Sequence, residues 1–347
     1  MSLEERIDRV MLRRNPDKDS RLARVAIESL HSEASSIARY VKLAMMPVDS
    51  EYTEKSITAG NNVVAHLRRG LKNVSFKFQG SVVANTHIKG ASDIDLLVLC
   101  ENFFTYNSRE VVESINKGCY NSSEEYNKLK RVISTPNYEG DIIQEMRLLR
   151  CSCEKIMRGV YDICDSKNSK AIKVTNKNLR RDVDVVVGSW YDDVTSILRD
   201  KSYPWRGVKI YNKQKNIRES VDYPFQCIEL MNQRDRLTNG RLKQMVRFLK
   251  TIKEDATTKI DLSSFCIYAI CYSLPIKSYI TANYLELVNI LTFYIYGLVT
   301  NKNEMNNLMS VDGREKVITS KAISEGVDKL YNELLEVFSE LKRGFLI

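Results

Sequence analysis

Apolar residues in the middle of the chain fall in short runs that are typical of β-strands. Ile94 to Cys100, with the sequence IDLLVLC, is apolar and partly β-branched, which is the pattern of a buried strand. Phe76 to Gln79 precedes it, and Ala171 to Val174 and Asp182 to Val187 follow it with similar patterns. We expect these four runs to share one sheet.

Residues on both sides of these runs repeat at helical spacing. Asp19 or Ser20 caps a predicted long helix that Pro47 ends, and a second helix is predicted from about Glu51 to Arg69. From about Pro224 the chain is predicted to be helical to its end. Helices at both ends of a central mixed sheet define an α+β protein.

This pattern predicts two parts. Residues 1–220 form a core that holds the N-terminal helices and a mostly helical insertion near 107–166, broken by a proline, asparagine and glycine cluster near 134–140. Residues 221–347 form a helical lobe. We expect this lobe to close a substrate cleft against the sheet.

Two acidic residues stand at the start of the Ile94 strand. Asp93 and Asp95 are two positions apart, so their side chains point to the same face about 7 Å from each other. Neighbouring carboxylates repel each other unless a cation lies between them. Mg²⁺ binds one or two carboxylates together with phosphate oxygens of a substrate, and paired ions lie about 3.5–4 Å apart. The pair therefore predicts a metal site.

A glycine turn precedes this strand. Gly80 lets the backbone turn and approach a ligand closely after the Phe76 to Gln79 run, and Ser81 adds a hydroxyl. Backbone amides at such a turn can bind an anion such as a phosphate. A GS pair or a pair of aspartates alone is more often a turn or a solvated strand end, but the two together at this spacing favour a nucleotide site.

The whole run, FQGSVVANTHIKGASDIDLLVLC, resembles the nucleotidyltransferase superfamily of DNA polymerase β. That superfamily has a GS turn, a variable stretch and two acidic residues separated by an apolar one. Gln79, Thr86 and Ile88 also fit the narrower pattern of the cGAS-like bacterial enzymes, the CD-NTases. The resemblance implies a polymerase β-like core, a long N-terminal spine helix across both lobes, and Gln79, Gly80 and Ser81 at the nucleotide.

The family needs a third carboxylate on a neighbouring strand. Asp182 and Asp184 have the same strand phase, so periodicity does not separate them. The family's usual DVVP aligns with the run that begins at Asp184, although Val187 stands in place of the proline. Asp184 is the predicted third metal ligand, and Asp182 is the alternative.

Downstream, the run GRLKQMVRFLKTIKED predicts an amphipathic helix with Lys243, Arg247 and Lys250 on its polar face. Such a basic face is usually only solvated. In the family, a similar helix ends in a lysine that reaches the triphosphate, and Lys250 has the matching position. Ser264 and Phe265 match a serine and aromatic pair that follows, which implies Ser264 at the phosphates; Asp261 or Ser263 can cap the same helix.

The resemblance implies metal-dependent attack of a ribose hydroxyl on the α-phosphate of a nucleoside triphosphate, with Asp93, Asp95 and Asp184 holding two Mg²⁺ or Mn²⁺ ions. The product would be a cyclic di- or trinucleotide messenger for antiphage (CBASS-type) defence, with a regulatory or conjugating protein as a possible partner. The alternatives are a linear oligonucleotide or poly(A)-type synthase, an aminoglycoside-type nucleotidyltransferase and, from another class, an inactive nucleotide-binding module.

Composition is compatible with this interpretation. The net charge of +9 fits the handling of polyanions, and eight cysteines without a CxxC pair indicate reduced thiols in a cytoplasmic protein. With three histidines and no zinc signature, no visible motif requires a nucleic-acid activator. The charged start of the chain argues against a signal peptide, and the apolar window at 284–299 is too short to span a membrane.

Base choice, ring size and linkage depend on pocket side chains that the pattern does not identify. Trp190, Tyr191 and Tyr203 are candidate stacking partners for a base.

Overall fold

The structure is a computed structural model that describes residues 2–14, 35–90, 92–136 and 138–345. The chain forms two compact units. The sheet unit comprises residues 54–83 and 93–229, and the helical unit comprises the described residues up to 53, residues 84–92 and those from 230 onward.

A mixed seven-stranded sheet is the centre of the sheet unit. Its strands are β1 (Val74–Gln79), β2 (Ile94–Cys100), β3 (Cys164–Asp165), β4 (Ala171–Asn176), β5 (Arg181–Tyr191), β6 (Gly207–Asn212) and β7 (Ile217–Asp222). The order is β1-β2-β5-β4-β3, while β6 pairs with the last part of β5 and with β7. Only the β2–β5 pair is parallel among these strands. The four predicted strands are confirmed, and β6 and β7 were not predicted.

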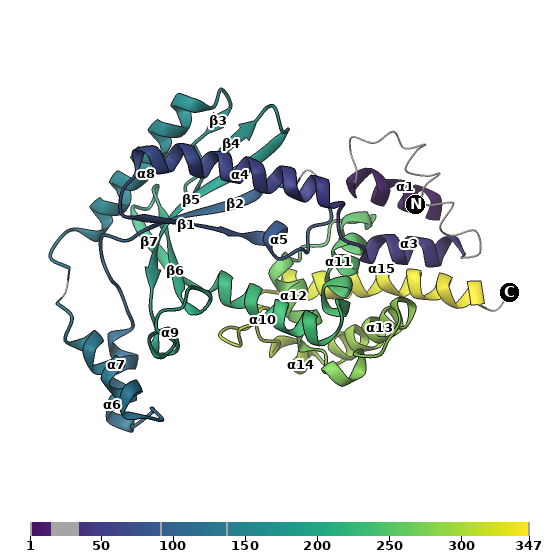
Figure 1. Cartoon of the computed structure of the whole chain (residues 1–347). Helices are drawn as coiled ribbons and strands as arrows, with labels where there is room; N and C mark the ends of the chain where they lie inside the picture. The colour runs from purple at the N-terminus through teal and green to yellow at the C-terminus, as the bar shows by residue number, and fades with distance from the viewer. Residues whose placement is uncertain (1, 15–34, 91, 137, 346–347) are drawn as a thin grey trace. The chain divides into compact units, whose positions relative to one another are not determined.

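Two long helices, α4 (Ser50–Gly70) and α8 (Ile142–Val160), lie across one face of the sheet (Figure 1). They bury the alternate residues of β2 and β5 that face them, among which Ile94, Leu96 and Val185 are fully buried. Because side chains alternate along a strand, Asp95 and Asp184 must lie on the other face. The packing of the core therefore decides where the acidic residues stand.

The insertion predicted near 107–166 is helical, as expected. It contains α6 (Ser108–Lys117), α7 (Ser123–Ile133) and α8, and side chains of Asn107, Ser122 and Asp141 cap their first turns. α6 and α7 pack with α9 (Val194–Leu198) around a small apolar cluster of their own. The remaining short elements of this unit are α5 (Gly80–Val83) and the 3-10 turn at Tyr203–Trp205.

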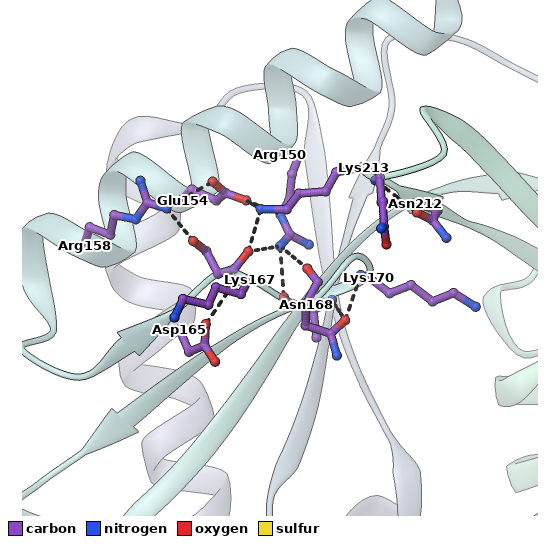
Figure 2. A network of polar contacts seen from close by, with 12 residues as sticks. Arg150, Glu154, Arg158, Asp165, Lys167, Asn168, Lys170, Asn212 and Lys213 are labelled. Carbon is purple, nitrogen blue, oxygen red and sulfur yellow. Dashed lines mark hydrogen bonds and ion pairs between the residues drawn. The ribbon is translucent and has the colours of Figure 1, made fainter.

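A buried arginine fixes the turn that leads into β4 (Figure 2). Arg150 of α8 is 1% exposed and donates hydrogen bonds to the backbone carbonyls of Asn168 and Ala171 and to the Glu154 carboxylate. Lys213 also donates to Glu154. A buried guanidinium needs acceptors for its donors, and here they are Glu154 on α8 and carbonyls at the β3–β4 connection, while Nη1 has no hydrogen-bond partner among the described residues. The start of β4 is thereby held against α8.

The helical unit is built around α11 (Arg241–Asp255). Its other helices are α1 (Leu3–Arg14), α3 (Ser36–Met45), most of α10 (Pro224–Leu237), α12 (Ser264–Ser273), α13 (Tyr284–Thr300), α14 (Lys302–Asn306) and α15 (Lys321–Phe345), with a 3-10 turn at Ile276–Ser278. α11 contacts α1, α3, α12, α13 and α15. Arg13 and Tyr40 both bind the buried carboxylate of Asp255, which ties the N-terminal helices to α11.

The predicted helix from Asp19 or Ser20 begins in residues 15–34, which lie outside the described part of the chain, and α3 ends just before Pro47. The division into units differs from a boundary at residue 220, because α1 and α3 group with the C-terminal helices. Within the described ranges, no helix combines the length and apolar character needed to cross a bilayer.

Candidate active site

Asp95 and Asp184 stand directly opposite each other on the parallel strands β2 and β5. Adjacent strands are about 4.8 Å apart, so both carboxylates share one face at close range. Burial raises the pKa of Asp95 to about 6, with further contributions from the charges of Asp184 and Asp93. Burial also raises the pKa of Asp184. A crowded and desolvated pair of this kind gains free energy when a cation binds between its members.

Asp93 and Asp182 are joined by a lysine. Lys173 of β4 lies opposite Asp184 in the strand register, and its Nζ is 2.8 Å from Asp93 Oδ2 and 3.0 Å from Asp182 Oδ2. The hydroxyl of Thr175 donates to the other oxygen of Asp182 at 2.6 Å. Asp182 therefore has two protein partners, whereas Asp184 faces Asp95, and this arrangement supports Asp184 as the third metal ligand.

The carboxylates fit magnesium in their chemistry. Mg²⁺ prefers hard oxygen ligands and tolerates only one or two carboxylates with water and phosphate oxygens in the rest of its shell. Asp95 and Asp184 supply such oxygens side by side. In the described part of the chain, no three His, Cys, Asp or Glu side chains already enclose a metal position, and Asp93 is turned toward Lys173.

Gly80 makes the predicted turn between β1 and α5. Its φ of +86° lies in the left-handed region, and a Cβ at this position would overlap Asp95 Oδ2. β1 also pairs with β2 so that Gln79 lies opposite Asp95. The turn at Gly80 and Ser81 is thus in direct contact with a predicted metal ligand, which is the placement that a phosphate-binding turn needs.

Lys250 and Ser264 belong to the helical unit. Lys250 Nζ donates to the Thr86 carbonyl at 2.8 Å, and burial lowers the pKa of Lys250 to about 8. Ser264 is the first residue of α12, where Ser263 provides the N-cap through a bond from the Cys266 amide. Their action on the same nucleotide as the carboxylates, across a cleft between sheet and helices, stays a prediction.

The basic face of α11 is less exposed than its sequence indicates. Arg247 is 5% exposed and donates to the backbone carbonyls of Met45 and Asn85 at 2.7 and 2.8 Å. Lys243 donates to Asn232 Oδ1. These two residues hold the helical unit together, and among the three only Lys250 was predicted at the phosphates.

One candidate stacking residue was wrong. Trp190 is 5% exposed, packs in the core with Phe225, and donates its indole N–H to Ser75 Oγ at 3.1 Å. No face of this ring is available to a base. Tyr203 is 47% exposed and Tyr191 is half-buried, so these two stay candidates.

Sequence reasoning missed Lys173. Its position in the Ala171 to Val174 strand, out of phase with the buried Ile172 and Val174, placed it on the polar face. The signal was present, but the register between β4 and β5 was needed to place its amine beside Asp93 and Asp182.

Known proteins resemble this chain over nearly its whole length. Residues 229–338 match the model of the cGAS/DncV-like nucleotidyltransferase C-terminal helical domain. The chain is 39% identical over 311 residues to a c-di-GMP synthase of Capnocytophaga granulosa, covering 89% of this chain and 88% of that protein. It is 33% identical over 360 residues to a c-di-GMP synthase of a Flavobacteriaceae bacterium, covering 99% and 98%.

Solved structures give the same result. A STING-associated CdnE c-di-GMP synthase from Flavobacteriaceae superposes with a TM-score of 0.87 at 32% identity, over 98% of both chains. The corresponding synthase from Capnocytophaga granulosa gives 0.81 at 35% identity, over 99% of both chains.

The fold and the acidic site define a nucleotidyltransferase. The chain belongs to the cGAS/DncV-like family of bacterial nucleotidyltransferases, the CD-NTases, and the predicted family, α+β fold and enzyme class are confirmed.

The overlap at Gly80 generates a first prediction. Gly80→Ala should reduce nucleotidyl transfer by roughly 100-fold or more, because its Cβ must displace the Asp95 carboxylate. Gly118→Ala is the matched control, since Gly118 has a φ of +67° and nothing within 4 Å of its Cβ position. Both variants should lose about 1 kcal/mol of unfolding free energy from backbone strain. Equal loss of activity in both, measured as pyrophosphate release, would contradict the assignment.

A second prediction separates the two aspartates of β5. Asp184→Asn should lower the rate of pyrophosphate release by roughly 10³-fold or more, because it removes a carboxylate opposite Asp95. Asp182→Asn should retain activity within about tenfold, because Asp182 binds Lys173 and Thr175. The reverse order of the two rates would identify Asp182 as the ligand.

A third prediction concerns the buried charge of Lys250. Its folded-state pKa of about 8 lies below the usual lysine pKa of 10.5, so the folded state is destabilised below pH 8 and this penalty disappears as the pH rises toward 10.5. Lys250→Met should therefore raise the unfolding free energy by about 1–2 kcal/mol at pH 7, after loss of the bond to Thr86, and should lower it by up to about 1 kcal/mol at pH 10.5, where only the loss of that bond remains.

Denaturant unfolding at several pH values measures this difference. Lys321→Met, which removes a lysine whose side chain is 91% exposed, is the control and should change little. A Lys250→Met protein that is less stable than the native protein at pH 7 would show that the buried amine is not under strain.

Proposed function

We propose that this enzyme makes c-di-GMP from two molecules of GTP. Similarity to c-di-GMP synthases of 39% and 33% identity, extending over nearly the whole length of the chain, is the observation that carries the proposal. A ribose hydroxyl of one nucleotide attacks the α-phosphate of the other, a phosphodiester bond forms and pyrophosphate leaves. The same step repeated within the linear intermediate closes the ring and releases a second pyrophosphate.

The acidic residues hold and prepare the reacting groups in this proposal. Asp93 and Asp95 bind two Mg²⁺ or Mn²⁺ ions, and Asp184 binds one of them. When bound, the ions neutralise phosphate charge and favour the ionised form of the attacking hydroxyl. Asp184, whose pKa is raised by burial, is suited to take the proton of that hydroxyl.

The remaining predicted residues hold the phosphates. The backbone at Gly80 and the hydroxyl of Ser81 bind phosphate oxygens, and Gln79 lies next to them opposite Asp95. Lys250 and Ser264 contribute a cation and a hydroxyl from the helical unit. The negative charge of a triphosphate would favour the charged form of Lys250, whose pKa is lowered by burial in the free protein.

The product would act as a second messenger in antiphage defence of the CBASS type. This part of the proposal is supported by the STING-associated synthases among the structural neighbours. GTP as substrate points to action in the cytoplasm. A regulatory or conjugating protein is a further proposed partner. The described residues contain no motif that requires a nucleic-acid activator.

Product analysis tests the proposal. The purified protein is incubated with Mg²⁺ and each α-³²P-labelled nucleoside triphosphate, alone and in pairs, then treated with phosphatase. GTP alone should give a phosphatase-resistant product that co-migrates with c-di-GMP, and Asp93→Asn should give none. A resistant product that requires ATP would overturn the choice of GTP, and a ladder of linear products would favour the oligonucleotide synthase. Label transferred only to an added aminoglycoside would favour the small-molecule nucleotidyltransferase.

A further inference from the structure

The acidic site contains four carboxylates, one more than the three predicted metal ligands. Asp93, Asp95, Asp182 and Asp184 all come from the same ends of β2 and β5 and share one face of the sheet. Four carboxylates in this space repel one another, and two of them are partly withdrawn from water. Lys173 is the one cation that forms ion pairs with members of this group among the described residues.

The position of Lys173 is set by the strand register. Lys173 lies opposite Asp184, and Thr175 lies opposite Asp182. The lysine reaches past Asp184 to Asp182 at 3.0 Å and to Asp93 at 2.8 Å, and its own pKa is raised by these two partners. The hydroxyl of Thr175 donates to Asp182 Oδ1, so the carboxylate of Asp182 is bound by Thr175 as well as by Lys173.

The two partners of Lys173 differ in what they can do. Asp182 is held by Thr175 from the same pair of strands, whereas Asp93 stands before β2 and is exposed. Asp93 is also the predicted metal ligand. A divalent cation that binds Asp93 shares this carboxylate with the positive charge of Lys173, which contacts Oδ2, whereas the contact of Lys173 to Asp182 does not involve the predicted ligand.

We propose that Lys173 is an internal counter-ion of the active site, which neutralises Asp93 in the metal-free enzyme and releases it when a divalent cation binds. This inference rests on the metal site of the proposed function. It follows that the nucleotide-free enzyme binds divalent cations weakly, because the first ion binds a carboxylate that the lysine already neutralises and is repelled by the ammonium group. Metal that arrives already bound to a nucleoside triphosphate brings further ligands and overcomes this repulsion.

Mn²⁺ binding to the nucleotide-free protein tests the inference. Free Mn²⁺ is measured by electron paramagnetic resonance during titration of the native protein, Lys173→Met and Lys177→Met. Lys173→Met should bind Mn²⁺ about 5–10-fold more tightly, since a positive charge beside a metal ligand is removed. Lys177→Met removes the same charge from an exposed pair with Asp162 and should bind like the native protein. Lys173→Arg, which keeps the charge, should also bind like the native protein.

Thermal unfolding gives a second readout. In EDTA, Lys173→Met should unfold a few degrees below the native protein and Lys177→Met, since one positive charge no longer offsets the carboxylates. Mn²⁺ should then raise its unfolding temperature by more than it raises that of the native protein. Loss of the fold in EDTA with recovery in Mn²⁺ would be the extreme form of the same result.

Unchanged or weaker Mn²⁺ binding by Lys173→Met, when the native protein binds measurably, would overturn the counter-ion role. Asp95→Asn separates this failure from a failure of the proposed metal site. If Asp95→Asn and the native protein bind Mn²⁺ equally, the ion does not bind at these carboxylates, and the proposed function loses its metal site together with the inference.

Discussion

Mutual repulsion between carboxylates on neighbouring strands is the constraint on which the site depends. Asp95 and Asp184 are forced into register by the apolar residues between them, because Ile94, Leu96 and Val185 are buried against α4 and α8. A slip of one residue would expose these apolar side chains and bury the charges instead. The core therefore keeps the partly buried carboxylates of Asp95 and Asp184 close together although they repel each other. That unfavourable energy is recovered when a cation binds.

The helical unit also contains a buried charged group, the positively charged Lys250. Burial lowers the pKa of Lys250 to about 8, while burial raises that of Asp95 to about 6. Both shifts disfavour the charged form in the free protein, and both are typical of groups whose partner is a ligand. In the proposed function these ligands are a divalent cation for the aspartates and a phosphate group for the lysine. Burial of these charged groups lowers the free energy of unfolding of the ligand-free enzyme.

Sequence patterns sufficed where local periodicity decides the structure. The alternation in IDLLVLC placed Asp95 opposite the buried Ile94, and the glycine at position 80 has the left-handed φ and close contact that such a turn needs. Periodicity did not separate Asp182 from Asp184, because only the register with β4 shows that Lys173 and Thr175 engage Asp182. The preference for Asp184 over Asp182 came from the resemblance to the family and not from the pattern.

Long-range packing explains what the sequence did not predict. Arg247 has the spacing of a solvated cation, yet carbonyls of Met45 and Asn85, distant in sequence, make it a buried donor. Trp190 was a candidate for stacking on a base, but its ring packs against Phe225 and is buried. The strand β7, with the sequence IRESVD, is largely polar and exposed, so it lacks the apolar alternation of a half-buried strand and is recognised only through its pairing with β6.

The most direct test of the central claim is the position of the metal. A crystal of the protein with Mn²⁺ and a non-hydrolysable GTP analogue gives anomalous peaks that locate each ion. We expect peaks within about 2.0–2.4 Å of carboxylate oxygens of Asp93, Asp95 and Asp184, with Lys173 still bound to Asp182. Manganese bound away from these three aspartates, with the analogue in place, would contradict it.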